Sequence, residues 1–196
     1  MTPIVAGVLV GGAATRMGGR PKGLLLAPDG QAIVHRTLAI LTAAGIGDIV
    51  LVGAHPAYEA TGRKALTDDP GGIGPFGGLL SLLRYAQARL AVALACDMPF
   101  VSSALVERLI SAPSAPVVAP RRDGRWEPLC ARYDPPQVLS VAMRRAASNE
   151  YSLQRLLDDT GAVGLPLTPK EADELRDWDT MEDVESKDAS VRPAER

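Results

Sequence analysis

Several short runs of almost purely apolar residues predict the strands of one sheet. A run that is apolar at every position is typical of a strand covered on both faces, as in a parallel sheet. Four runs have this character: residues 4–10, 49–52, 90–96 and 116–119. Three further segments show a weaker strand pattern, the second of them with mixed faces: residues 64–67, 126–133 and 162–167.

Between these runs, apolar residues recur at the three- and four-residue spacing of helices. This spacing and the capping residues beside it predict helices at residues 32–45, 79–88, 103–110, 137–147 and 152–158, and a short last helix capped by Thr180. The breaker-rich segment 70–78 is predicted to be an irregular loop. Because strands and helices alternate, the fold class that we predict is α/β: a Rossmann-like three-layer α/β/α sandwich with a mainly parallel sheet.

The length of 196 residues suits one domain with a single core. With 46% hydrophobic residues the chain can fill such a core, and neither an internal repeat nor a linker divides it. We predict a single domain over residues 1–185 and a disordered polar tail over residues 186–196. The sequence shows neither a membrane-length apolar run nor a leader with a cleavage site, which predicts a cytoplasmic protein.

Charge and composition narrow the range of partners. A net charge of −2 and 4% aromatic residues argue against binding to nucleic acid or to a membrane surface, so any nucleotide ligand should be a mononucleotide. Cys96, Cys130, His35 and His55 do not have the spacing of a zinc site, and the two cysteines are expected to be buried thiols rather than a disulfide. A bound metal should be a hard ion held by carboxylates and phosphate oxygens.

The segment after the first strand has the composition of a phosphate-binding loop. Residues 9–25 read LVGGAATRMGGRPKGLL and combine glycines, a hydroxyl and three cationic side chains without an acid. Glycines let backbone N–H groups approach an anion, and Arg16 and Lys22 supply positive charge. Because Lys22 stands between Pro21 and Gly23, the spacing is not that of a P-loop, and the glycines do not have the dinucleotide-binding spacing either.

Carboxylates are expected at the same edge of the sheet as this loop. Asp97 ends the apolar run 90–96, where an unpaired carboxylate would be poorly solvated unless it faced a cation. The carboxyl ends of parallel strands meet at one edge, where open α/β sheets bind ligands. The groups predicted to meet there are the Gly11 loop, Gly53, Asp68, Asp97 and either Asp177 or Asp179.

These segments resemble the molybdenum cofactor guanylyltransferases, which belong to a wider superfamily of nucleotidyltransferases. The family signature L-x-G-G-x-x-x-R-M-G-G-x-x-K-G-L is matched by residues 9–24, its C-D-x-P segment by residues 96–99, and its D-x-x-P-G-x-G-P-L-x-G segment approximately by residues 68–78. The resemblance spans about residues 4–185. It implies that a terminal phosphate on molybdopterin attacks the α-phosphorus of GTP, that pyrophosphate leaves, and that Mg²⁺ is the cofactor.

The resemblance also implies roles for individual residues. Arg16, Lys22 and Asp97 would be catalytic, with Asp97 as the metal ligand. The implied nucleotide-binding residues are Leu9, Val10, Gly11, Gly12, Thr15, Arg16, Lys22, Gly53, Asp68 and Asp97. The implied acceptor-binding residues are Gly77 and Gly78, with free backbone donors at a helix start, and Trp126, Asp177 and Asp179. A half-buried strand tryptophan is an equal alternative for Trp126. The expected partners are GTP, molybdopterin and cofactor-delivery proteins, for a monomer or weak homo-oligomer.

Several positions depart from the family's pattern, among them Met181 in place of Pro and Val10 in place of Ala. Asp177 and Asp179 stand where the family has Asn, and Gly53 stands where guanylyl members commonly have an Asn that reads the base. Without an amide at Gly53 we expect only a modest preference for GTP, which Gly53→Asn would sharpen. The alternatives are a cytidylyltransferase acting on the same pterin, a related sugar-phosphate nucleotidyltransferase and a non-catalytic nucleotide-binding protein.

Overall fold

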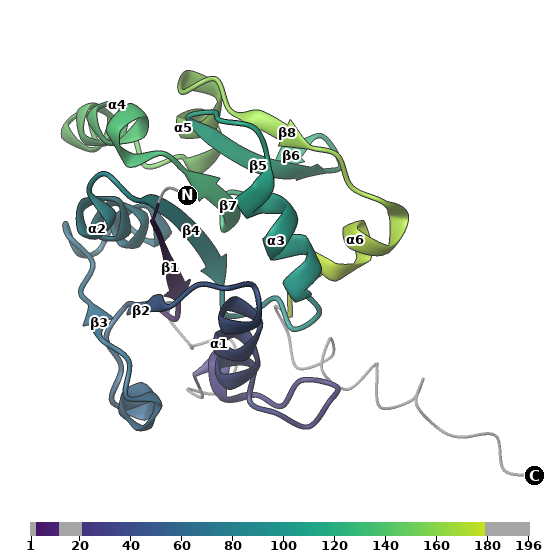
Figure 1. Ribbon diagram of the computed structural model, residues 1–196. Coiled ribbons are helices and arrows are strands. Elements are labelled where there is room, and N and C mark those ends of the chain that lie inside the picture. Colours follow the sequence, from purple (N-terminus) through teal and green to yellow (C-terminus); the bar gives the residue numbers. More distant parts are fainter. Residues whose placement is uncertain (1–2, 12–20, 179–196) are drawn as a thin grey trace, which may run out of the picture.

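One mixed sheet runs through the middle of the protein, as the computed structural model shows for the residues that it describes, 3–11 and 21–178 (Figure 1). Its strands are β1 (Ile4–Leu9), β2 (Asp48–Val52), β3 (Ala65–Leu66), β4 (Leu90–Ala95), β5 (Val117–Arg122), β6 (Arg125–Trp126), β7 (Cys130–Tyr133) and β8 (Val163–Leu165). Their order is β3-β2-β1-β4-β7-β5-β6, with β8 paired to β5. All except β6 and β7 point in the same direction, because β7 is antiparallel to β4 and β5, and β6 is antiparallel to β5.

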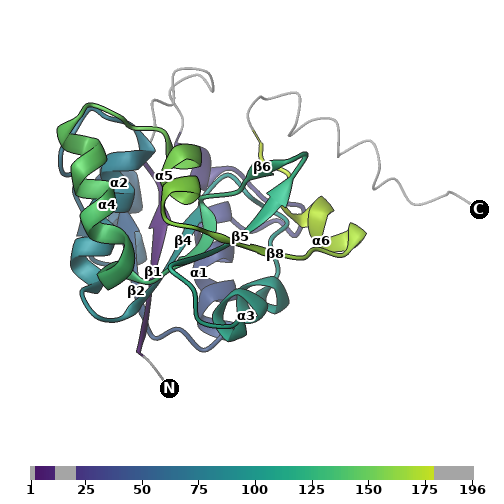
Figure 2. The same cartoon turned by 90° about the horizontal axis from the view of Figure 1, so that it is seen from above.

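Helices cover both faces of this sheet. They are α1 (Ile33–Ala43), α2 (Pro75–Ala86), α3 (Ser103–Ser111), α4 (Pro135–Ala147), α5 (Leu153–Asp159) and α6 (Pro169–Glu174), together with the 3-10 helices η2 (Lys22–Leu24) and η3 (Pro56–Thr61). Helices α2 and α4 lie on one side of the sheet and α1 and α3 on the other (Figure 2). The predicted three-layer α/β/α sandwich is therefore confirmed.

Two cores, one on each face of the sheet, explain the uninterrupted apolar runs. Along β1, Ala6 and Val8 pack into the core beneath α1 and α3, whereas Val5 and Leu9 pack into the core beneath α2. Successive side chains of a strand point to opposite faces, so a strand covered on both sides is apolar at every position. Parallel pairing holds from β3 through β2 and β1 to β4, and β7 introduces antiparallel pairing beyond it.

Several elements differ from the sequence prediction. Segment 126–133 forms two strands, β6 and β7, rather than one. Helix α2 begins earlier than predicted, at Pro75, where the missing N–H of proline would have had no partner in any case. Helix α6 was not predicted, although Thr168 and Glu171 form a reciprocal capping box around Pro169 that is readable in the sequence.

The two cysteines are free and buried, as predicted, and burial raises the pKa of each thiol to about 12. In the described part of the chain, every helix is too short or too polar to cross a membrane. Thr180 and the tail over residues 186–196 lie outside the described residues.

Candidate functional site

The carboxyl ends of β1 and β2 meet in a close backbone contact between two glycines. The N–H groups of Val10 and Gly11 both donate to the carbonyl of Val52, at 2.9 and 3.2 Å. Gly53 follows with a φ of +98°, and a Cβ atom built on it would lie 2.7 Å from both the N and the Cα of Gly11. Only glycine fits at residue 53, because other residues rarely adopt such a φ and the opposing atoms are backbone.

This geometry corrects the expectation that Gly53→Asn would sharpen base selection. The new side chain would have to displace Gly11, so the substitution would damage the site instead. Leu9 and Val10 are buried, and the carbonyl of Leu9 accepts the N–H of Cys96 at 3.1 Å. At this edge the sheet already uses the carbonyls of Leu9 and Val52 and the N–H groups of Val10 and Gly11.

Asp68 lies beside this contact, on the side of α2. A Cβ built on Gly78 would lie 3.3 Å from its Oδ1, and one built on Gly11 would lie 3.9 Å from its Oδ2. The hydroxyl of Ser81 in α2 holds the backbone on both sides of Asp68. It accepts the N–H of Asp69 at 2.9 Å and donates to the carbonyl of Thr67 at 2.8 Å. Burial raises the pKa of the Asp68 carboxyl. The structure thus brings Asp68 and Gly11 together, as predicted.

Gly77 and Gly78 have a packing role in the first turn of α2, where both are buried. A Cβ on Gly77 would come closer than 3.0 Å to the carbonyl oxygen of Pro70, and one on Gly78 would lie 2.9 Å from the side chain of Val52. The N–H of Gly77 already donates to the carbonyl of Gly74 at 3.1 Å, so the expectation of a free donor there is wrong. A contact of either glycine with an acceptor stays a prediction.

Lys22 and Asp97 form an ion pair at the carboxyl end of β4. Nζ of Lys22, in η2, lies 3.4 Å from Oδ2 of Asp97, and the two side chains are 25% and 27% exposed. Burial raises the pKa of Asp97, Lys22 lowers it and the charge of Asp177 raises it, with a raised pKa as the net result. The pair presents one positive and one negative group at an open edge of the sheet, where the first can bind an anion and the second a cation.

A second carboxylate reaches this edge from the last described residues. The N–H of Trp178 donates to the carbonyl of Asp97 at 2.9 Å, which holds the neighbouring Asp177 near Asp97. Oδ1 of Asp177 lies 3.4 Å from Nη2 of Arg122, and Nε of Arg122 lies 3.0 Å from Oε1 of Glu127. Burial raises the pKa of Glu127, against the lowering effect of Arg122. The predicted proximity of Asp97 and Asp177 is found.

Sequence reasoning missed Arg122 and Glu127. Both belong to the hairpin of β5 and β6, whose turn has Asp123 at a φ of 50° and Gly124 at 77°. Asp-Gly with positive φ at both residues is a typical two-residue hairpin turn. The sequence RRDGR at residues 121–125 was therefore a signal that charged side chains are carried to the end of a strand.

Trp126 lies in the core rather than open to a ligand. It is 6% exposed, its Nε1 donates to Asp158 at 2.8 Å, and the guanidinium of Arg121 lies 3.8 Å from the ring centroid. Its backbone N–H and carbonyl are both bonded to the side chain of Gln154. This arrangement agrees with the alternative of a strand tryptophan that packs into the core, and a contact of Trp126 with the acceptor stays a prediction.

Four of the predicted site residues lie outside the described part of the chain: Gly12, Thr15, Arg16 and Asp179.

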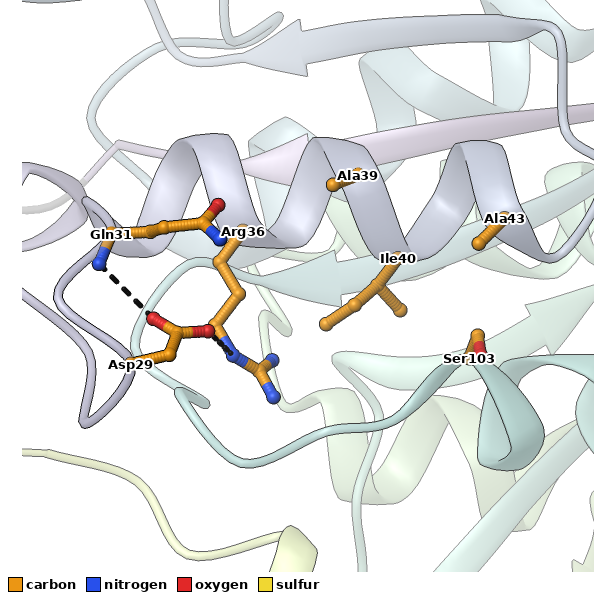
Figure 3. Close-up of a pocket in the computed structure, with 7 residues that line it drawn as sticks. All are labelled: Asp29, Gln31, Arg36, Ala39, Ile40, Ala43 and Ser103. Atoms are coloured by element: carbon orange, nitrogen blue, oxygen red, sulfur yellow. Dashed lines mark hydrogen bonds and ion pairs between the residues drawn. The ribbon is translucent and has the colours of Figure 1, made fainter.

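A shallow groove between α1 and the start of α3 is separate from the site (Figure 3). The guanidinium of Arg36 in this groove lies 3.1 Å from Asp29 and donates to the carbonyl of Val101 at 2.9 Å. The charged groups of the groove thus already have partners.

The carboxylates of the site suit a hard cation only together with ligand oxygens. Within residues 3–11 and 21–178, no group of three or more His, Cys, Asp and Glu side chains is arranged to hold a metal. Asp97 and Asp177 supply two interacting carboxylates at one edge. Mg²⁺ is usually held by one or two carboxylates together with waters and substrate phosphates, so the donor set fits Mg²⁺ beside a nucleotide.

Several known proteins are similar to this chain in sequence or in fold. The MobA-like NTP transferase domain family matches residues 6–163. A molybdenum cofactor guanylyltransferase of Pseudomonas putida is 34% identical over 171 residues, which cover 81% of this chain and 84% of that protein. The crystal structure of molybdopterin-guanine dinucleotide biosynthesis protein A from Archaeoglobus fulgidus has a TM-score of 0.77 at 21% identity, covering 96% of this chain and 100% of that chain. The 2-C-methyl-D-erythritol 4-phosphate cytidylyltransferase from Thermus thermophilus has a TM-score of 0.68 at 17% identity, covering 98% and 100%.

Proposed function

Because this chain belongs to the MobA-like NTP transferase domain family, we propose that it transfers GMP from GTP to the terminal phosphate of molybdopterin. The products would be molybdopterin guanine dinucleotide and pyrophosphate. The name of the Pseudomonas putida relative supports this choice of reaction. The likeness to the two solved structures supports the fold and leaves the choice of base open.

The observation that carries the proposal is the Lys22–Asp97 pair at the carboxyl edge of the sheet. In the reaction, an oxygen of the acceptor phosphate bonds to the α-phosphorus of GTP. The bond from that phosphorus to the bridging oxygen breaks, and pyrophosphate leaves with the electron pair. Because the acceptor phosphate is already ionised, the site mainly has to align the reactants and offset negative charge.

Lys22 would supply part of that positive charge. Its ammonium would move from Asp97 to the β- or γ-phosphate, while the backbone at Gly11 faces the base and ribose. Asp97, joined by Asp177, would hold Mg²⁺, which supplies further positive charge beside the phosphates. Asp68 would contact the nucleotide from the side of α2.

A cytidylyltransferase acting on the same pterin is the second candidate. It is supported by the residue at position 53, because glycine has no side-chain amide that would select guanine over other bases. The same feature leads us to expect a preference for GTP that is modest rather than steep.

Competition among the four nucleoside triphosphates tests this proposal. A ligand that binds only the folded state raises the Tm, so we expect GTP with Mg²⁺ to raise it most. With molybdopterin as acceptor, GTP should support pyrophosphate release, and Asp97→Asn should reduce that release by about a hundredfold with an unchanged circular dichroism spectrum.

Two results would contradict the guanylyl assignment. A larger Tm shift and faster turnover with CTP than with GTP would favour the cytidylyl alternative. Nucleotide binding without pyrophosphate release would favour a non-catalytic nucleotide-binding protein.

A further inference from the structure

Tyr58 lies buried beneath the turn that carries Lys22, far from it in the sequence. Its side chain is 3% exposed, and its hydroxyl oxygen accepts the N–H of Gly23 at 3.2 Å. Gly23 directly follows Lys22 in η2. Burial raises the pKa of Tyr58 to about 12, so the phenol is neutral near pH 7.

The N–H of Gly23 needs an outside partner because η2 cannot supply one. Within the turn, the N–H of Leu24 donates to the carbonyl of Pro21 and that of Leu25 to Lys22, each at 3.0 Å. The first N–H groups of a helix have no intrahelical acceptor, and a buried N–H without a partner is unfavourable. Gly23 is buried, and its N–H finds this partner in the Tyr58 hydroxyl, with the Cys96 thiol also interacting with it.

The contact is tight, and Tyr58 itself is held by η3. A Cβ built on Gly23 would lie 2.9 Å from the hydroxyl of Tyr58 and 3.1 Å from its Cε1. The side chain of His55 accepts the N–H of Ala57 at 3.1 Å, and Thr61 donates to the carbonyl of Tyr58 at 2.8 Å. These bonds hold both ends of η3, the element that carries the Tyr58 ring.

We propose that Tyr58 is a positioning residue for Lys22. By holding η2, it keeps the ammonium of Lys22 at the carboxyl edge of β4 and so determines how tightly the outer phosphates of a nucleotide are bound. The inference rests on the proposed function, because it takes the partner of Lys22 to be a triphosphate. A charge that is already positioned binds its ligand more tightly than one that must be ordered during binding.

Calorimetric titration with GTP and with GMP tests the inference. In Tyr58→Phe we expect the affinity for GTP to fall about tenfold and that for GMP by less than about twofold. Adding Tyr58→Phe to a Lys22→Ala variant should change GTP affinity little, because the residue through which Tyr58 acts is already gone.

Tyr85→Phe is the matched control. It removes a hydroxyl that lies 3.3 Å from Asp48, and it should leave both affinities unchanged. Gly23→Ala disturbs the Tyr58 contact from the other side and should also weaken GTP more than GMP, which keeps the inference testable if Tyr58→Phe folds poorly.

Two outcomes would overturn the positioning role while leaving the proposed function intact. One is an equal loss of affinity for GTP and GMP in Tyr58→Phe, and the other is an undiminished loss in the Lys22→Ala background. Failure of the unmodified protein to bind GTP would instead overturn the proposed function, and this inference with it.

Discussion

Asp68 and Asp97 have raised pKa values because folding removes part of the water around each carboxyl. At Asp97, Lys22 opposes this effect from 3.4 Å away. At Asp68 the cause is burial. A carboxylate that the folded state solvates poorly lowers stability whenever it is ionised. Perturbed acids of this kind gather where a ligand or a cation is to be bound, which agrees with the proposed role of both residues.

We expect Asp68→Asn to raise the Tm of the nucleotide-free protein by about 1–2 °C at pH 7. The folded-state pKa of Asp68 lies above the unfolded value, so the folded state holds the proton more tightly and stability falls as pH rises through that folded pKa. The advantage of the variant should therefore shrink as the pH is lowered to about 4. Thermal unfolding across this pH range measures it.

The adjacent carboxylate provides the control for that measurement. Asp69 pairs with Arg84 at 2.6 Å, so Asp69→Asn should not raise the Tm. A lower Tm for Asp68→Asn than for the unmodified protein at pH 7 would show that this carboxylate has a stabilising partner.

Site residues could be predicted from the sequence where the type of side chain and its position relative to a predicted strand point to the same role. Asp68 and Asp97 each combine a carboxylate with a position directly after a predicted strand, and Lys22 belongs to a cationic, glycine-rich loop. All three are found at one edge of the sheet. Arg122 and Glu127 were missed because their roles depend on where the β5–β6 hairpin places them, and the segment around Tyr58 has no clear period. The local pattern of apolar and polar residues does not reveal contacts between segments that are distant in the sequence.

Helices and strands could be predicted where burial gives their sequence one clear hydrophobic pattern. Strands β1, β2 and β4 are covered on both faces, so their sequences contain little besides apolar residues. Segment 126–133 has strand composition throughout, yet it turns between β6 and β7, where the N–H of Cys130 donates to the carbonyl of Glu127 at 3.1 Å. Pro128 inside this segment was the available signal, because proline has no N–H to donate to a neighbouring strand and is disfavoured in strand interiors.

The first turn of α2 packs closely against the loop before it through Gly77, and a substitution there tests this contact. We expect Gly77→Ala to lower the free energy of unfolding by about 1–2 kcal/mol. Alanine favours a helix over glycine by about 1 kcal/mol, but overpacking costs about 1–3 kcal/mol, and here the obstacle is the backbone carbonyl of Pro70 rather than a mobile side chain. Urea unfolding measures the difference.

Gly47→Ala is the control for this substitution. A Cβ at Gly47 meets nothing within 4 Å, so the change should be neutral or slightly stabilising through the unfolded state. If Gly77→Ala proved as stable as Gly47→Ala, the loop at Pro70 would have to yield easily, and the packing explanation for Gly77 would be wrong.

At the scale of the whole molecule, the last described residue packs against the segment that follows β1. The ring of Trp178 is 4% exposed and forms a small core with Leu25, Ala27 and Ile33. It also meets the ring of Phe100 edge to face, with centroids 5.9 Å apart. This core joins the Lys22 turn, the Asp97 loop and Asp177, which come from three distant parts of the chain. The sequence gave no signal of this contact, because Trp178 is a single aromatic residue among charged neighbours.

We expect Trp178→Ala to lower the free energy of unfolding by about 3–5 kcal/mol, because it removes a buried ring and leaves a cavity. Trp178→Phe should cost much less, since an aromatic ring stays in place and the indole N–H, which has no hydrogen-bond partner in the described part of the chain, is removed. Both variants keep the backbone bond from residue 178 to Asp97. Urea unfolding followed by circular dichroism separates the two variants. Equal losses would contradict the cavity explanation, because a phenylalanine ring should fill most of the space that alanine leaves empty.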